Sequence, residues 1–135
     1  MIKTIRPLPN SLFNACDPLG IQLLTRLRVG LSHLRDHKFK HGFQDTINPL
    51  CPCSNMETES ISHFFLRCPF YTNEPLNLID ELLLIVPNIQ QFDENAVIEL
   101  LLYGSKNFRN EINSKIINLS IRFIIASKRF DMPLL

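Results

Sequence analysis

The chain has 135 residues, of which 45% are hydrophobic and 20% are charged, and its formal net charge is +1. This length suits one compact domain with a buried core. It excludes a polymerase, a kinase or a barrel enzyme, each of which needs about 200 residues or more. The composition also excludes a disordered tail and a uniformly basic protein that coats DNA.

Charge is distributed unevenly along the chain. Residues 1–42 carry seven Lys or Arg against two Asp or Glu, residues 43–105 carry one against nine, and residues 106–135 carry six against two. Such a basic–acidic–basic pattern is typical of a chain that presents a positive face while it stays in solution. An acidic segment that folds back to neutralise the basic ones would give the same pattern, and the sequence leaves both arrangements open.

The sequence predicts an intracellular protein, in the nucleus or the cytoplasm, that does not enter a membrane. Its longest apolar stretch, residues 82–86, stops at Pro87, whereas a membrane-spanning helix needs about 20 apolar residues. No apolar block of the kind found in a secretory signal follows residues 1–7, so we do not expect secretion. The four cysteines are therefore interpreted as thiols or metal ligands rather than as disulfides.

Two short helices are predicted to follow an N-terminal arm or linker over residues 1–16. The first begins at Pro18, which suits the first helical position after an Asp N-cap, and it ends at Gly30. The second begins at Ser32, a favoured capping residue, and stops at Gly42. The two helices are expected to meet at a tight turn around Gly30.

The rest of the chain is also predicted to be helical, after a turn-rich stretch over residues 43–56. A short helix is expected over residues 58–68, Asn73 and Asp93 are expected to cap the next two helices, and the last helix begins near residue 106. Apolar residues at helical spacing predict the buried faces of these last three helices: Leu76, Ile79, Leu83 and Val86; Val97, Leu100 and Leu101; and Ile112, Ile116, Leu119 and Phe123. The fold class that follows is mainly α.

The sharpest chemical signal is a cluster of three cysteines and one histidine. Cys51 and Cys53 flank Pro52, His63 follows after nine residues, and Cys68 follows after four more. Pro52 is expected to hold two thiolates on a tight knuckle, and one helical turn would bring the other two ligands to the same point. Three thiolates and one imidazole favour Zn²⁺ over calcium or magnesium, and a closed set of four ligands is structural rather than catalytic. The sequence therefore predicts a small helical domain with one zinc knuckle.

A simpler interpretation makes the three cysteines small buried apolar residues and His63 a core histidine. The turn-forming residues around Cys51 and Cys53 argue against it, because a core helix or strand would exclude them. Cys16 lies outside the cluster and is interpreted as a spare thiol.

Five basic residues lie within 15 positions across the first two helices: Arg26, Arg28, Arg35, Lys38 and Lys40. On a helix pair joined by a tight turn they could follow a sugar-phosphate backbone, so we expect RNA or DNA to bind there. The alternative is a solvated helix face. His33, His37 and His41 lie at helical spacing among these residues and are assigned to the same hydrophilic face, because no carboxylate completes a metal site with them.

We expect one domain overall. Residues 17–72 would form the basic helix pair and the zinc-binding module, and residues 73–135 would form helices that pack on it. The chain contains no Asp-Asp pair, no glycine-rich phosphate loop and no nucleophile elbow, so we do not expect it to be an enzyme.

Three segments of the chain resemble a known family. Residues 23–34 (LLTRLRVGLSHL), the Cys51-Pro52-Cys53 knuckle and residues 59–71 (ESISHFFLRCPFY) are similar to the zinc-binding C-terminal region of reverse transcriptases from non-LTR (LINE-type, jockey-like) retrotransposons. In that family an R-x-G-H-x-x-L helix precedes a cysteine pair, and an H-x-L-x-x-C-P-x-Y stretch supplies two further ligands. Here residues 28–34 and 63–71 stand in the matching places, with His33 shifted along the chain relative to the family's histidine.

The resemblance implies a module that helps such an enzyme hold its template RNA or target DNA, without the polymerase, endonuclease or RNase H domains. We therefore expect a C-terminal fragment of such a reverse transcriptase, whose partners would be RNA or DNA and the rest of the retrotransposon polyprotein. Two alternatives stay open. The apolar helices after residue 73 and the acidic middle segment would suit a protein-interaction domain, and a non-functional mobile-element remnant would carry the same motifs.

Overall fold

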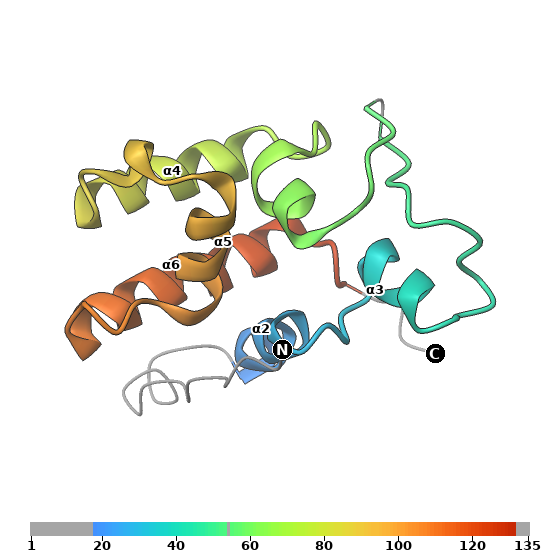
Figure 1. Cartoon of the computed structure of the whole chain (residues 1–135), viewed down its shortest axis with the longest axis horizontal. Coiled ribbons are helices and arrows are strands. Elements are labelled where there is room, and N and C mark those ends of the chain that lie inside the picture. The colour runs from blue at the N-terminus through green and yellow to red at the C-terminus, as the bar shows by residue number, and fades with distance from the viewer. Residues whose placement is uncertain (1–17, 54, 132–135) are drawn as a thin grey trace.

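The fold is an assembly of helices, seen in a computed structural model that describes residues 18–53 and 55–131 (Figure 1). Its elements are α2 (Pro18–Arg28), α3 (Arg35–Lys40), a π-helix (His63–Arg67), α4 (Asn73–Ile85), a 3₁₀ turn (Ile89–Gln91), α5 (Glu94–Tyr103) and α6 (Asn110–Ser127). Within the described residues, the only β-type pairing is an isolated antiparallel bridge between Leu50 and Thr58. The mainly α class expected from the sequence is confirmed. The predicted arm, the Asp17 cap and Cys16 lie outside the described residues.

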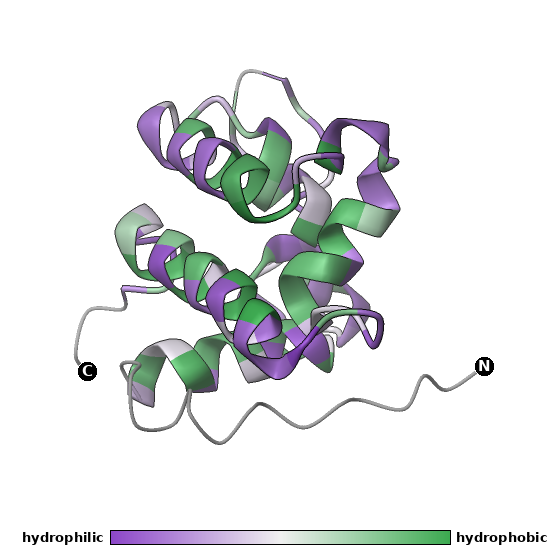
Figure 2. Cartoon of the chain, turned by 90° about the vertical axis from the view of Figure 1, so that its left-hand side faces the viewer, coloured by the Kyte–Doolittle hydropathy of each residue, from purple (hydrophilic) through white to green (hydrophobic). Residues whose placement is uncertain are grey.

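Helix α6 is the centre of the packing, because α2, α4 and α5 all contact it. Its buried face includes Ile116, Ile117 and Ile124, each at most 1% exposed. Gly20 on α2 allows one of these contacts, since a Cβ atom at that position would lie 2.4 Å from a methyl carbon of Ile121. The helices are amphipathic, with hydrophobic residues on one face and hydrophilic residues on the other, as Figure 2 shows. Their hydrophobic faces form the shared core.

An aromatic cluster joins the π-helix to this core. The ring of Phe64 lies 5.1 Å from that of Phe123 on α6, 5.4 Å from that of Phe130 and 5.7 Å from that of Tyr71, measured between centroids. All three contacts are edge-to-face or nearly so, which is a favourable geometry for aromatic rings. The segment that carries His63 and Cys68 is therefore fixed to α6 by packing.

Several predicted helix ends are confirmed. Gly30 and Gly42, the predicted helix ends, follow α2 and α3 with φ of +75° and +72°, and Gly104 follows α5 in the same way with φ of +69°. These values favour glycine. The Asp93 side chain caps α5 by accepting a hydrogen bond from the backbone N–H of Ala96 at 2.7 Å. Local sequence signals were sufficient at these positions.

Other predicted helix boundaries are wrong. Helix α3 begins at Arg35 rather than at Ser32, whose hydroxyl instead accepts a hydrogen bond from the Leu34 N–H at 3.2 Å and so stabilises the preceding turn. Asn73 is the first residue of α4 and makes no side-chain cap, and α6 begins at Asn110 rather than near residue 106. The Ser105–Phe108 stretch forms a turn first, with the Phe108 N–H bonded to the Ser105 carbonyl at 3.1 Å.

The predicted buried face of α4 is wrong at one position. Leu76 is 64% exposed, whereas Leu78 and Leu82 are 3% and 0% exposed. Two residues correspond to about 200° around an α-helix, so Leu76 and Leu78 cannot share a face. None of the helices in the described residues combines the length and the hydropathy of a membrane-spanning segment.

Candidate metal centre

The loop that carries Cys51 and Cys53 is a short hairpin. The Cys51 N–H donates to the Glu57 carbonyl at 2.7 Å, and the Glu59 N–H donates to the Pro49 carbonyl at 2.8 Å, on either side of the Leu50–Thr58 bridge. At its tip the Met56 N–H donates to the Cys53 carbonyl at 3.2 Å. Met56 adopts the left-handed region with φ of +53°, which closes the turn. These bonds hold both thiols on one compact loop.

The other two candidate ligands come from the π-helix. The Cys68 N–H donates to the His63 carbonyl at 2.8 Å, a bond between residues five apart that is characteristic of π-helix geometry. In an α-helix two residues five apart would point about 140° away from each other. The wider π turn therefore brings the side chains of His63 and Cys68 to the same side, as the spacing of the motif required.

The structure brings all four predicted ligands together. The sulfur atoms of Cys51, Cys53 and Cys68 and a ring nitrogen of His63 all lie within 4.8 Å of one another. Cys51 Sγ is 3.8 Å from Cys68 Sγ, and Cys53 Sγ is 3.4 Å from His63 Nε2. All four residues are buried, with exposed fractions of 0–4%. This cluster could hold a metal ion.

Burial and neighbouring groups shift the pKa values of the three cysteine thiols. Burial raises the pKa of the Cys51 thiol to about 12, and burial also raises the pKa of Cys68. For Cys53 burial acts in the same direction, but hydrogen bonds to its sulfur, first from the backbone of Asn55, outweigh it and lower the pKa. The raised pKa values of Cys51 and Cys68 favour the protonated thiols, and a metal ion that binds as a thiolate complex displaces those protons.

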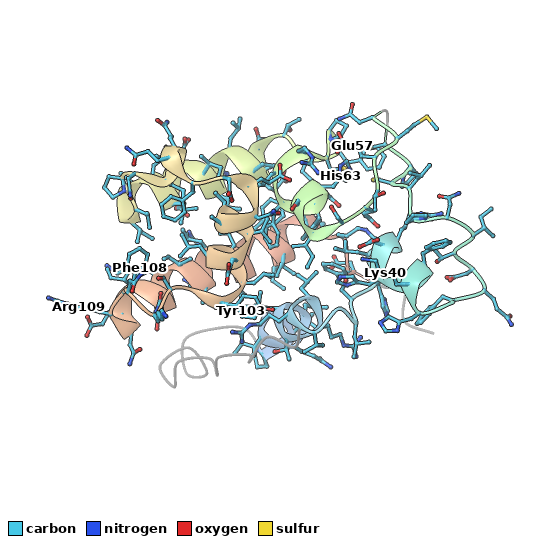
Figure 3. All side chains as sticks on the ribbon, viewed as in Figure 1. Lys40, Glu57, His63, Tyr103, Phe108 and Arg109 are labelled. Carbon is cyan, nitrogen blue, oxygen red and sulfur yellow. The ribbon has the colours of Figure 1, made fainter. Side chains whose placement is uncertain are left out.

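A carboxylate orients the histidine. Glu57 Oε2 lies 3.3 Å from His63 Nδ1, and Figure 3 shows the two side chains together at this end of the molecule. A neutral imidazole that donates its Nδ1 hydrogen to Glu57 presents the Nε2 lone pair to the thiols. Arg67 Nε donates to the same Glu57 oxygen at 2.9 Å, and Arg67 Nη1 reaches the carboxylate of Glu94 on α5 at 2.5 Å. The cluster is thereby tied to the helical core.

The five predicted nucleic-acid contacts do not form one row. Arg28 turns toward the core, with its guanidinium 4.7 Å from the centre of the Tyr103 ring. Lys40 pairs with Asp36 at 3.1 Å within α3, and Arg26 is exposed on α2. Only Arg35 and Lys38 face one common pocket, which is described below.

The sequence assigns three histidines to one hydrophilic helix face, and the structure corrects this assignment. His33 lies before α3, not on it, and His37 is only 8% exposed. The backbone N–H of Ser32 donates to His37 Nδ1 at 3.2 Å, and the Ser32 hydroxyl lies 2.6 Å from the same nitrogen. His37 is thus a buried histidine that fixes the turn between α2 and α3, and it is not part of a hydrophilic face.

The acidic middle segment neutralises part of the basic flanks. Glu59 pairs with Arg129 at 2.7 Å, Asp45 pairs with Lys38 at 2.7 Å, and Glu81 pairs with Arg122. The carboxylates of Glu57 and Glu59 both make tertiary contacts, Glu57 with His63 and Glu59 with Arg129.

The supporting residues of the site could not be found from sequence spacing. Glu57 belongs to the hairpin and Arg67 to the π-helix, and their ion pair depends on how these two segments pack. Arg129 lies 70 positions from Glu59.

Comparisons of the chain with models of protein families, with curated proteins and with solved structures find no match.

Proposed function

We propose that the four clustered residues bind one Zn²⁺ ion as a structural site. With bonds of about 2.3 Å to sulfur and 2.0–2.1 Å to nitrogen, tetrahedral zinc places two sulfurs about 3.8 Å apart and a sulfur and a nitrogen about 3.6 Å apart. The Cys51–Cys68 separation is 3.8 Å and the Cys53–His63 separation is 3.4 Å. This agreement, in a buried site with three soft sulfur ligands, is the observation that supports zinc.

The role proposed for the ion is to fix the hairpin on the core. A site closed by four protein ligands leaves no position for a substrate, which is the pattern of structural zinc sites. The ligands come from two segments, the hairpin and the π-helix, and the π-helix is packed on α6 through Phe64. Zinc would therefore join a loop that has little core of its own to a well-packed element.

We further propose that the zinc-stabilised end of the molecule binds RNA or DNA. Three basic side chains on α2 and α3 support this. Arg26 is exposed on α2, and Arg35 and Lys38 of α3 line one pocket together with Cys51 of the knuckle. The residues shared with non-LTR retrotransposon reverse transcriptases, His63 and Cys68 above all, support the further proposal that the chain is a C-terminal module of such an enzyme. Its partners would then include the rest of that polyprotein.

The salt dependence of binding tests the nucleic-acid proposal. Each phosphate neutralised contributes about 0.7–0.9 to the slope of log affinity against log salt concentration. The triple variant R26A/R35A/K38A should lower that slope by about 2–3 for a single-stranded RNA. The matched control, K106A/R109A/K115A, removes three basic side chains near the other end of the chain. This control should leave the slope unchanged. Equal slopes for both triple variants would contradict the proposal, and a parent that binds with no salt dependence would favour an apolar protein interface.

We propose that this module binds without catalysis. Phosphoryl transfer by two metal ions needs clustered carboxylates, and the nearest pairs in the sequence are committed to other contacts: Glu57 and Glu59 as above, and Glu81 with Arg122. The zinc-loaded chain should therefore incorporate no nucleotides on a primed template with magnesium. Measurable magnesium-dependent incorporation would contradict this.

A further inference from the structure

A pocket of about 440 Å³ adjoins the candidate metal cluster. It lies between α3, the knuckle and the segments that follow the π-helix and α6, and Cys51 and Pro52 form one wall of it. Neither the candidate zinc site nor the packing of the core explains why this pocket is present. Its other walls combine aromatic rings with cationic side chains.

Three aromatic residues line this pocket. Phe43 and Phe70 are 48% and 59% exposed, so part of each ring is accessible to a ligand. Tyr71 is more deeply placed, and its ring is held edge-on against Phe64 at 5.7 Å. The pocket therefore offers one rigid ring and two accessible rings, which a planar group can stack on.

The cations of the pocket are positioned beside these rings. Lys38 Nζ lies 5.7 Å from the centre of the Phe43 ring and pairs with Asp45, a mostly exposed side chain at the rim. Arg35 donates only a long bond of 3.5 Å to the Asn48 carbonyl, and its Nε has no hydrogen-bond partner among the described residues. Arg129 is already neutralised by Glu59. Among the described residues no carboxylate forms an ion pair with the Arg35 guanidinium, so Arg35 can receive an anionic group.

We infer that this pocket binds an unpaired base of a single-stranded nucleic acid, stacked on Phe43 and Phe70 with its phosphate at Arg35. The inference rests on the proposed nucleic-acid function and adds to it the form of the ligand. Stacking on aromatic rings next to a basic groove is the general mode of single-strand binding, and it is denied to a duplex whose bases are already stacked. The knuckle forms a wall of the pocket, so the zinc site and the base site are adjacent parts of one surface.

Variants of Phe43 test this, because Phe39 provides a matched control. Phe39 is a 44% exposed phenylalanine on α3 that does not line the pocket. The zinc-loaded full chain is titrated with a single-stranded RNA of about 12 nucleotides and with the duplex of the same length. Phe43→Leu should weaken single-strand binding by about fivefold to a hundredfold, because loss of one stacked base costs that much. It should leave duplex binding within about twofold of the parent.

Two further variants separate stacking from folding. Phe43→Tyr keeps an aromatic ring and should retain single-strand affinity, whereas Phe39→Leu removes an exposed ring elsewhere and should change nothing. Zinc content and helical circular dichroism, measured for every variant, identify any that fails to fold, and Phe70→Leu then provides an independent repeat of the measurement. If Phe43→Leu and Phe70→Leu bind single strands as tightly as Phe39→Leu does, the pocket inference is wrong and the nucleic-acid function still stands. If the parent chain binds neither the single-stranded RNA nor the duplex, the proposed nucleic-acid function itself fails.

Discussion

Arg129 and Glu59 are 70 positions apart in the chain, yet their side chains form a bidentate ion pair. Arg129 Nε donates to Glu59 Oε2 and Arg129 Nη2 donates to Glu59 Oε1, each at 2.7 Å. Arg129 Nη2 also donates to the His33 carbonyl at 2.9 Å, and the Arg35 N–H donates to the Glu59 carboxylate at 2.8 Å. The pair therefore joins three regions: the end of α6, the metal-binding hairpin and the start of α3.

Removing the arginine should destabilise the protein strongly. The Glu59 side chain is only 5% exposed, so Arg129→Met would leave a buried carboxylate with a backbone N–H as its remaining partner. We expect a loss of about 3 kcal/mol in the free energy of unfolding, measured by urea denaturation of the zinc-loaded chain. The double variant with Glu59→Gln should recover part of that loss, because it removes the unpaired charge. A single variant as stable as the parent would show that the pair contributes nothing.

Glu57 should set the affinity of the site for zinc. It orients His63 through Nδ1, and loss of such a carboxylate partner typically weakens metal binding by about 10- to 100-fold. We therefore expect Glu57→Gln to weaken zinc binding by that range, measured by competition with a chromophoric chelator. Glu94→Gln is the control, since Glu94 contacts Arg67 but not His63. Equal affinities in the two variants would mean that the carboxylate does not act through the histidine.

His37 should make the stability of the fold depend on pH. Burial lowers its pKa below the ordinary value of 6.5, so the folded chain binds fewer protons there than the unfolded chain does. The stabilisation from neutral His37 is therefore complete above about pH 6.5 and is lost as the pH falls toward the lowered pKa. Protonation would also turn Nδ1 into a donor and break its bond with the Ser32 N–H.

The measurement compares unfolding free energies at about pH 7.5 and about pH 5.5 for the parent and for His37→Gln. The parent should lose more stability than the variant over this interval. His41→Gln, at an exposed position of the same segment, is the control and should follow the parent. Loss of zinc at low pH affects all three proteins alike, so the difference between the profiles reports on His37. Parallel profiles for parent and His37→Gln would contradict the prediction.

The fold class and the four clustered residues could be predicted because their signals are local. Gly30 and Asp93 mark helix ends through their own backbone and side-chain preferences, and the structure uses both. The metal cluster follows from residue types and short spacings, since Cys51 and Cys53 share one loop and His63 and Cys68 share one turn. Such signals do not depend on how distant elements pack.

What the sequence did not predict depends on tertiary contacts. The turn between His63 and Cys68 is a π-helix where the spacing predicted an ordinary helix, and its Phe64 ring packs on Phe123 of α6, a contact that the local sequence does not specify. The face of α4 was misjudged at Leu76 because several leucines in that helix permit more than one helical stripe. The pairing of Glu59 with Arg129 joins distant segments, so its partners become visible only in the folded chain.

The most direct measurement is the zinc content of the purified chain together with its fold after chelation. We expect one zinc ion per chain, lost in Cys51→Ser and in Cys68→Ser but retained in Cys16→Ser, whose cysteine lies outside the cluster in the sequence. Structural zinc contributes roughly 10–16 kcal/mol of apparent folding free energy in small modules, so chelation should unfold the hairpin and the π-helix and expose their amides to hydrogen exchange. A chain that takes up no zinc, or one that keeps full exchange protection over residues 49–68 without it, would contradict a structural metal site.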